Sequence, residues 1–453
     1  MTGLAIDRRQ SLNLTRAVAG TIGTRILAYT FAAVTGILIA RLLGPADRGV
    51  YGVLISTTSI LHAIGALGIG SANVYYIARN HSVNSIVNNS LGIGLGVSVL
   101  LITCFLLFFL ATQEQLFPGV TVILILVAVA GTPAVLFHGY FSGILLGQSR
   151  IAVLNLLSIG MGFLQLVAIM MLMIFLKVGI LELLSITLVI ASLNAGVIIY
   201  LVKQSEGVHI NFALDLAIIR QMVRFSGAAY VANLLHLIAT RSDILLLYFF
   251  VGGSAVGHYA VAAMFAQMFL LVPDSVQRVM LVRFSSNNIQ SANQLIPLVH
   301  RTILVLMLIL ALISGLLAGP VLGILLGAQY EASAMLFTLL LPGVVAGASR
   351  GMTSSYLAGR GRPDISMKVA FACLAIVVGI DLILIPQIGA IGAAIAASAA
   401  NIAGASLQLM VVLKWSGTRF WDVMFPKRDD LRYILTHLLN RHREEPFYGR
   451  GTD

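Results

Sequence analysis

The sequence predicts an all-α, polytopic membrane protein with about twelve transmembrane helices in two six-helix, pseudo-symmetric lobes around a central cavity. Three observations lead to this prediction: an extreme apolar composition, a series of long apolar runs, and a motif that occurs once in each half. The 453 residues are 59% hydrophobic and only 10% charged, with a mean hydropathy of +0.98. Because a soluble domain carries about 25% charged residues, this chain cannot cover a water-facing surface.

Apolar runs long enough to cross a bilayer recur along the whole chain. A helix needs about 20 apolar residues to span the hydrocarbon core, and runs of continuous rather than alternating hydrophobicity exclude a β-barrel. The first run is too long for the apolar region of a signal peptide and is expected to stay as a helix. The predicted spans are 17–40, 50–78, 88–111, 118–146, 151–176, 180–202, 221–250, 256–283, 296–318, 331–358, 365–385 and 389–413.

The basic residues are distributed unevenly between the two sides of these spans. Of the 28 Lys and Arg residues, 22 fall in the N-terminus, the even-numbered loops and the C-terminal tail. Positively charged loops stay on the cytoplasmic side during insertion. We therefore expect a multi-pass protein of the cytoplasmic (inner) membrane with both termini on the cytoplasmic side. The net charge of +11 is therefore explained by topology, and no nucleic-acid partner is expected.

The pattern Gly-x4-Gly-x-Tyr occurs at residues 44–51 and again at 252–259, between apolar runs each time. Glycine permits tight reversals, and we expect the rings of Tyr51 and Tyr259 to lie among lipid headgroups. A second pair, LLGQSR at 145–150 and LAGRGR at 357–362, echoes the repeat on the opposite side. Two halves in the same orientation are typical of transporters with a cavity between the repeats.

The repeat and the polar segment 203–220 predict four parts. These are an N-terminal lobe, a cytoplasmic linker, a C-terminal lobe and a cytoplasmic tail, at 1–202, 203–220, 221–414 and 415–453. Leucines and Ile434 between 431 and 439 predict an amphipathic helix in the tail. Such a helix would lie on the membrane surface or, alternatively, dock on a partner.

Four segments carry a family resemblance: "ARLLGPADRGVYGVL", "GIGSANVYYIAR", "SDILLLYFFVGGSAVGHYAV" and "LIPQIGAIGAAIAASAAN". Their order and spacing resemble the polysaccharide-transporter branch, which includes O-antigen and exopolysaccharide flippases, of the multidrug/oligosaccharidyl-lipid/polysaccharide exporter superfamily. The resemblance implies a two-lobed transporter that moves a polyprenyl-diphosphate-linked oligosaccharide across the membrane. It also implies contact with membrane lipids and, as further partners, a glycan polymerase or export machinery.

Ionisable residues inside the predicted spans are the candidate substrate-binding residues, because a charge at membrane depth is costly unless it is paired or faces water. The candidates are Arg25, His62, His138, His236, Arg241, Asp243 and Arg350. Arginine suits a diphosphate because its guanidinium grips phosphate oxygens in pairs. The alternative is that each residue pairs locally or reaches the membrane surface.

Helical spacing predicts the helix face on which some of these candidate residues lie. Arg25 lies on a polar stripe of the first span, and His236 shares a face with Asp243. Arg241 is two residues from Asp243, so on a continuous helix it would point away from that face.

Two other functions compete with a flippase. A drug or cation antiporter of the same superfamily would favour acidic residues in the cavity, whereas Arg and His outnumber Asp in the predicted spans. A membrane enzyme of glycan assembly would need a large loop with paired carboxylates or a metal cluster, and every loop on the less basic side is short. We therefore expect no catalytic residue, no cofactor and no metal site.

Overall fold

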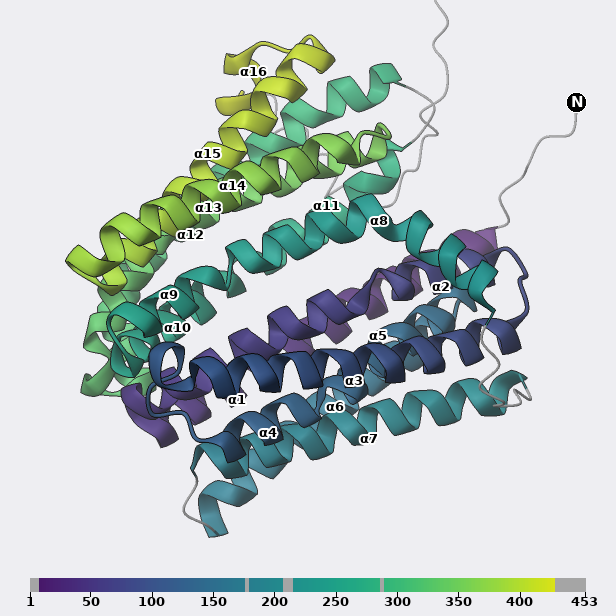
Figure 1. Ribbon diagram of the computed structural model, residues 1–453. Helices are drawn as coiled ribbons and strands as arrows, with labels where there is room; N and C mark the ends of the chain where they lie inside the picture. The colour runs from purple at the N-terminus through teal and green to yellow at the C-terminus, as the bar shows by residue number, and fades with distance from the viewer. Residues whose placement is uncertain (1–7, 176–178, 207–214, 286–288, 428–453) are drawn as a thin grey trace, which may run out of the picture.

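The computed structural model describes residues 8–175, 179–206, 215–285 and 289–427, and in these ranges it contains helices and turns without strands (Figure 1). The first half of the chain lies in the lower part of Figure 1, and the second half lies above it. The helices of the first half are α1 (Arg8–Ala66), α2 (Ile69–Ala78), α3 (Val83–Leu116), α4 (Val122–Ala130), α5 (Thr132–Gly147), α6 (Ile151–Phe175) and α7 (Ile180–Glu206).

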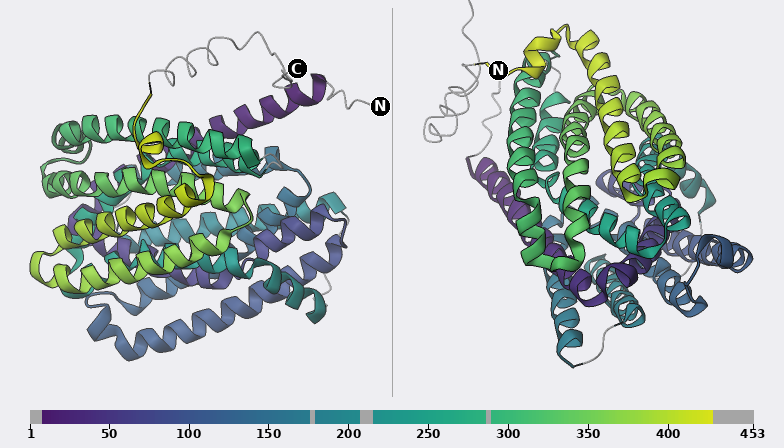
Figure 2. Two further views of the ribbon diagram at one scale, coloured as in Figure 1. Left: turned by 90° about the horizontal axis from the view of Figure 1, so that it is seen from above. Right: turned by 90° about the vertical axis from the view of Figure 1, so that its left-hand side faces the viewer.

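The second half repeats this sequence of long and broken helices. Its elements are α8 (Leu216–Ala239), α9 (Ser242–Phe250), α10 (Gly253–Met268), α11 (Leu271–Phe284), α12 (Ile289–Leu326), the 3₁₀ turn η1 (Ala328–Tyr330), α13 (Glu331–Gly359), α14 (Pro363–Ile388), α15 (Ala390–Ser416) and α16 (Phe420–Met424). The long helices run side by side in both views of Figure 2. The tail helix predicted over 431–439 falls outside the described residues.

Among the described residues, ten helical segments are long and apolar enough to cross a membrane, and the bent pair α10 and α11, at 44°, makes an eleventh. The first segment, Ile26–Ala78, has 53 residues, which would extend about 80 Å as one straight helix. It is divided at Gly44, whose φ of 69° interrupts α1. Counting its two arms separately gives the twelve predicted spans, so the all-α membrane fold is confirmed.

Residues with positive φ angles occur at equivalent turns in the two halves of the chain. Gly44 and Gly252 have φ values of 69° and 103°, and Gly119 and Gly327 have values of 79° and 87°. Both pairs are separated by the same interval in the chain, and glycine adopts this backbone conformation without a Cβ clash. These four turns lie at one end of the bundle, which we call the motif end. At the opposite end, Ser149 and Gly361 repeat another left-handed turn, with φ values of 62° and 72°. That end carries most loop arginines, and we call it the basic end.

The two copies of the glycine motif pack against each other at the motif end. A Cβ on Gly49 would overlap the carbonyl oxygen of Gly253, and a Cβ on Gly257 would overlap that of Pro45. The two contacts are equivalent by the repeat, because Gly49 corresponds to Gly257 and Pro45 to Gly253. The motif is therefore a reciprocal backbone contact between the halves, as small residues allow between membrane helices.

This packing corrects the prediction for the motif tyrosines. Tyr51 and Tyr259 are both buried, rather than placed at the membrane surface. The Tyr259 hydroxyl donates a hydrogen bond to Asp243 Oδ2, and the Arg48 guanidinium lies 5.4 Å from the centre of the Tyr51 ring. The motif faces the other half of the protein, so its aromatic rings turn inward with it.

The two halves also meet at the basic end. The rings of Tyr75 and Phe225 stack with their centres 4.1 Å apart. Nearby, Ser226 Oγ donates to the carbonyl of Gly68 at 2.8 Å, and the Tyr230 hydroxyl donates to that of Ile64 at 2.7 Å. Contacts between α2 and α8 therefore narrow the space between the halves at this end as well.

Candidate functional site

A cavity of about 730 Å³ opens among the helices of the second half. Its walls come from α8, α9, α10, α11, α13, α14 and α15, and Tyr29 of α1 contributes from the first half. The volume is within the range of small-molecule sites, about 300–1,000 Å³. Polar lining residues include Asn233, Gln277, Ser354, Asn401 and Gln408.

The structure brings together four of the seven residues predicted from the sequence: His236, Arg241, Asp243 and Arg350 all line this cavity. His62 in α1 and His138 in α5 are half-buried among the helices of the first half and do not line it. Arg25 belongs to α1, but its side chain lies outside the part of the chain that the structure describes.

Arg241 lines the cavity because the helix is broken where the sequence suggested continuity. Residues 240 and 241 form a turn between α8 and α9, and Arg241 has φ and ψ values of −122° and −17°. The helical periodicity of α8 therefore does not continue into α9. As a result, Arg241 lines the same cavity as Asp243 instead of pointing away from its face, and Asn233, His236 and Thr240 line this cavity as well.

In the described part of the chain, the Arg350 guanidinium contacts His236 and Cys373. Its Nη2 lies 3.2 Å from His236 Nδ1, and its Nη1 donates to Cys373 Sγ at 3.4 Å. Among the described residues, no ion pair joins Arg350 to a carboxylate. A guanidinium carries five N–H donors, so Arg350 has donors available to an anion that enters the cavity.

Two buried carboxylates lie beside the cavity. Asp243 is 4% exposed and accepts hydrogen bonds from the Tyr259 hydroxyl and the backbone N–H of Ile244. Asp381 of α14 is fully buried and interacts electrostatically with Asp243. Neither oxygen of Asp381 has a hydrogen-bond partner among the described residues. A buried carboxylate of this kind can bind a proton or a small monovalent cation, because either would offset the cost of its charge.

Asp381 is not among the residues predicted from the sequence. The available signal was an aspartate inside the predicted span 365–385, in the segment "GIDLIL". An isolated acidic residue in an apolar run would have qualified by the criterion used for Asp243. What the sequence could not provide is the proximity of Asp381 to Asp243, since α9 and α14 are far apart in the chain.

Asp243 and Asp381 lie at a different position along the length of the helical bundle from Arg350. At about 1.5 Å per residue, Asp243 and Asp381 lie about 10–12 Å from the motif-end termini of α9 and α14. Arg350 lies about 13 Å from the basic-end terminus of α13. Asp274 also lines the cavity, so the lining is mixed in charge.

The sequence matches the model of a protein family, and the fold matches solved structures. The family described as "Polysaccharide biosynthesis protein" matches residues 14–273. No curated protein matches the sequence. Among solved structures, the chain resembles the lipid II flippase MurJ in an inward closed conformation, with a TM-score of 0.74, 15% identity, and coverage of 96% of this chain and 94% of that chain.

A second similar structure is a multidrug resistance MATE family transporter of the MOP superfamily in an inward-facing conformation. Its TM-score is 0.71, with 17% identity and coverage of 92% of this chain and 96% of that chain. A third is a MOP superfamily transporter from Pyrococcus furiosus, with a TM-score of 0.63, 16% identity, and coverage of 89% and 95%. These likenesses establish the fold of this transporter superfamily. Since the family match covers more than half of the residues, the chain belongs to the polysaccharide biosynthesis protein family.

Proposed function

We propose that this protein moves a polyprenyl-diphosphate-linked oligosaccharide across the cytoplasmic membrane by alternating access, and that it has no enzymatic activity of its own. The family supports a role in polysaccharide formation, and the fold is shared with transporters, among them a lipid II flippase. The observation that carries the proposal is the Arg350 guanidinium, which faces a polar cavity without a carboxylate partner among the described residues.

The cavity supplies the two kinds of contact that such a substrate requires. Arg350 and the neighbouring His236 would bind diphosphate oxygens, since a guanidinium can donate two parallel hydrogen bonds to a phosphate. The amides of Asn233, Asn401 and Gln277 would donate to and accept from sugar hydroxyls. The lipid tail would remain in the bilayer while the headgroup crosses through the protein.

Alternating access requires that the two ends open in turn, and the contacts between the halves are suited to this. At the motif end the halves meet backbone to backbone, through Gly49 and Gly257. At the basic end they meet through side chains, including the stack of Tyr75 on Phe225. Opening at either end requires these contacts between the halves to separate.

A cation antiporter is the second candidate function, and the pair Asp243 and Asp381 is the observation that favours it. In the flippase, the same pair would supply the driving force by binding a proton or monovalent cation on one side and releasing it on the other. The two candidates therefore differ in the cargo, and transport assays with a lipid-linked oligosaccharide distinguish them.

Asp381→Asn is expected to remove the dependence of transport on a cation gradient, because an amide of the same shape carries no charge to bind the cation. The measurement is the rate of flipping in proteoliposomes with an imposed pH or sodium gradient. Asp364→Asn is the matched control, because Asp364 starts the same helix, α14, but pairs with Arg362 at the surface. If Asp381→Asn responded to the gradients like the wild type, the acidic pair would have no role in coupling.

A strain without this protein and without a paralogue is expected to accumulate lipid-linked oligosaccharide on the inner leaflet and to lose surface glycan. Leaflet location is measured by the access of a membrane-impermeant oxidant to the sugars in spheroplasts and in inverted vesicles. The wild-type gene on a plasmid should restore surface glycan. Normal surface glycan in the deletion strain would rule out the flippase.

A further inference from the structure

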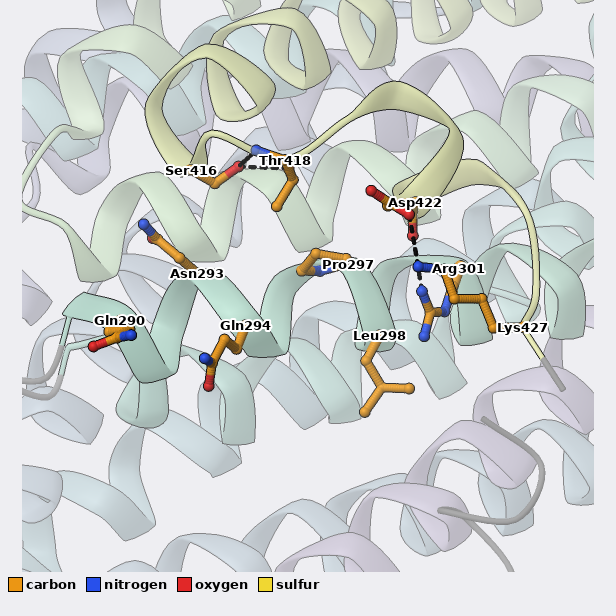
Figure 3. Close-up of a pocket in the computed structure, with 10 residues that line it drawn as sticks. All are labelled: Gln290, Asn293, Gln294, Pro297, Leu298, Arg301, Ser416, Thr418, Asp422 and Lys427. Atoms are coloured by element: carbon orange, nitrogen blue, oxygen red, sulfur yellow. Dashed lines mark hydrogen bonds and ion pairs between the residues drawn. The ribbon is translucent and has the colours of Figure 1, made fainter. Parts of the chain in front are cut away.

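The transport cavity is formed almost wholly by the second half of the protein, and one described residue of the first half reaches it. Tyr29 of α1 lines the cavity, whereas the other lining residues come from the second half. Another pocket, of about 670 Å³, lies between the start of α12 and the segment around α16, and its lining belongs to the second half throughout (Figure 3). A ligand in that pocket would contact one half alone, whereas a ligand at Tyr29 can contact both.

Tyr29 lies on the face of α1 that is turned toward the second half. Gly36 on the same helix packs against the Met264 side chain of α10, and a step of seven residues along an α-helix returns to the same face within about 20°. Phe31 points the other way, since its ring packs against that of Phe163 in α6 of the first half, with the centres 5.9 Å apart. Tyr29 therefore faces the second half about 10 Å from Gly36, on the side of the basic end.

The repeat explains why this position of α1 reaches the cavity. Leu237 of α8 is separated from Tyr29 by the same interval that separates Gly44 from Gly252, and Leu237 also lines the cavity. The helices α1 and α8 pack against each other, and in transporters built from repeats the substrate site lies where the repeats meet. The two halves thus present equivalent positions to one space, but one position carries an aromatic ring and the other an aliphatic chain.

The side chain of Tyr29 is available to a ligand. It is 43% exposed, and among the described residues no hydrogen bond engages its hydroxyl and no second ring packs on its ring. The face of an aromatic ring is slightly negative, and it attracts the slightly positive C–H groups on the apolar face of a sugar ring. Amides across the cavity, such as those of Asn233 and Asn401, can bind the hydroxyl groups at the edge of the same sugar.

On the basis of the proposed flippase function, we infer that Tyr29 stacks on a sugar ring of the cargo and thereby couples the cargo to the movement of the halves. A bound molecule shifts a conformational equilibrium only by as much as its affinity differs between the two states. Contacts made wholly within the second half keep their geometry when the halves move as rigid units. The contact with Tyr29 changes in that movement. A lipid diphosphate that carries a sugar ring therefore drives the conformational change more strongly than a bare lipid diphosphate.

The test compares polyprenyl diphosphate that carries one N-acetylglucosamine with polyprenyl diphosphate that carries no sugar. The full-length protein without its two native cysteines is spin-labelled at residues 47 and 254, at the motif end, and placed in bilayers with a saturating amount of either lipid. The distribution of distances gives the ratio of open to closed molecules. We expect the sugar-bearing lipid to shift this ratio about threefold to tenfold more than the bare lipid, as the strength of a stacked ring contact implies.

Tyr29→Leu is expected to remove the difference between the two lipids, because leucine, the residue at the equivalent position of α8, has no aromatic face. Tyr29→Phe is expected to preserve the difference, because the ring remains. Tyr200→Leu in α7 is the matched control, since Tyr200 is 60% exposed and does not line the cavity. In proteoliposomes with equal amounts of protein, flipping of the sugar-bearing lipid should fall about threefold to tenfold in Tyr29→Leu and stay unchanged in Tyr200→Leu.

Two results would contradict this role of Tyr29. The first is a difference between the two lipids that persists in Tyr29→Leu. The second is loss of the difference in Tyr29→Phe, which would assign the contact to the hydroxyl rather than to the ring. Either result leaves the flippase function in place as long as the wild-type protein flips the sugar-bearing lipid. If the wild-type protein flipped neither lipid, the proposed function itself would fail, and the role of Tyr29 with it.

Discussion

Gly49→Ala is expected to abolish export by separating the halves at the motif end. The new Cβ would overlap the carbonyl oxygen of Gly253, and the obstacle is backbone, which cannot move aside by changing a rotamer. Overpacking of this kind costs about 1–3 kcal/mol, enough to reduce the population of the closed state about tenfold to hundredfold. Alanine favours a helix over glycine by about 1 kcal/mol, so loss of α1 itself is not the expected cause.

The repeat provides a second, equivalent substitution that tests the same contact between the halves. Gly257→Ala should have the same effect, because Gly257 meets Pro45 in the equivalent contact. The control is Gly96→Ala in α3, where a Cβ would have nothing within 4 Å. Export is measured as surface glycan, and opening is measured as the distance between spin labels at residues 47 and 254 in a background without the two native cysteines. Normal export and an unchanged label distance in Gly49→Ala would show that this contact does not control the closed state.

Arg350→Ala is expected to lower the rate of flipping about tenfold to hundredfold at limiting substrate. Hydrogen bonds to a charged group contribute about 1.5–3 kcal/mol each, and each 1.4 kcal/mol corresponds to about a factor of ten. Arg350→Lys keeps the charge but loses the paired donors, so its rate should be intermediate. Among the described residues, its partners are His236 and Cys373 rather than a carboxylate, so its removal leaves no carboxylate unpaired.

The measurement is flipping of a lipid-linked oligosaccharide in proteoliposomes that contain equal amounts of each variant. Arg220→Ala is the control, because Arg220 lies exposed near the start of α8 and its loss changes the net charge equally. If Arg350→Ala flipped the substrate at the wild-type rate while Arg220→Ala did the same, the diphosphate would have to bind elsewhere. Arg25 would then be the next residue to test.

The sequence by itself determined the class of protein and the course of the chain. Twelve apolar runs require twelve helices, because a bilayer offers no other partner for the backbone of a single segment. The glycine turns were also predictable, since Gly44 and Gly252 take φ values that other residues adopt only with strain. Ionisable residues inside apolar runs indicated the cavity, because such residues are costly unless they serve a site. Four of the seven candidates line it.

Only the tertiary structure decided which side chains meet. The sequence placed Tyr51 and Tyr259 next to turns, but the direction of their rings depends on the other half of the repeat, which packs over them. The break between α8 and α9 rotates Arg241 into the cavity against the helical period. Three membrane spans lie between Asp243 and Asp381 in the sequence, and the packing of α9 against α14 brings the two carboxylates into electrostatic interaction. Periodicity describes one helix at a time, whereas a site inside a membrane is formed by the faces that several helices turn toward each other.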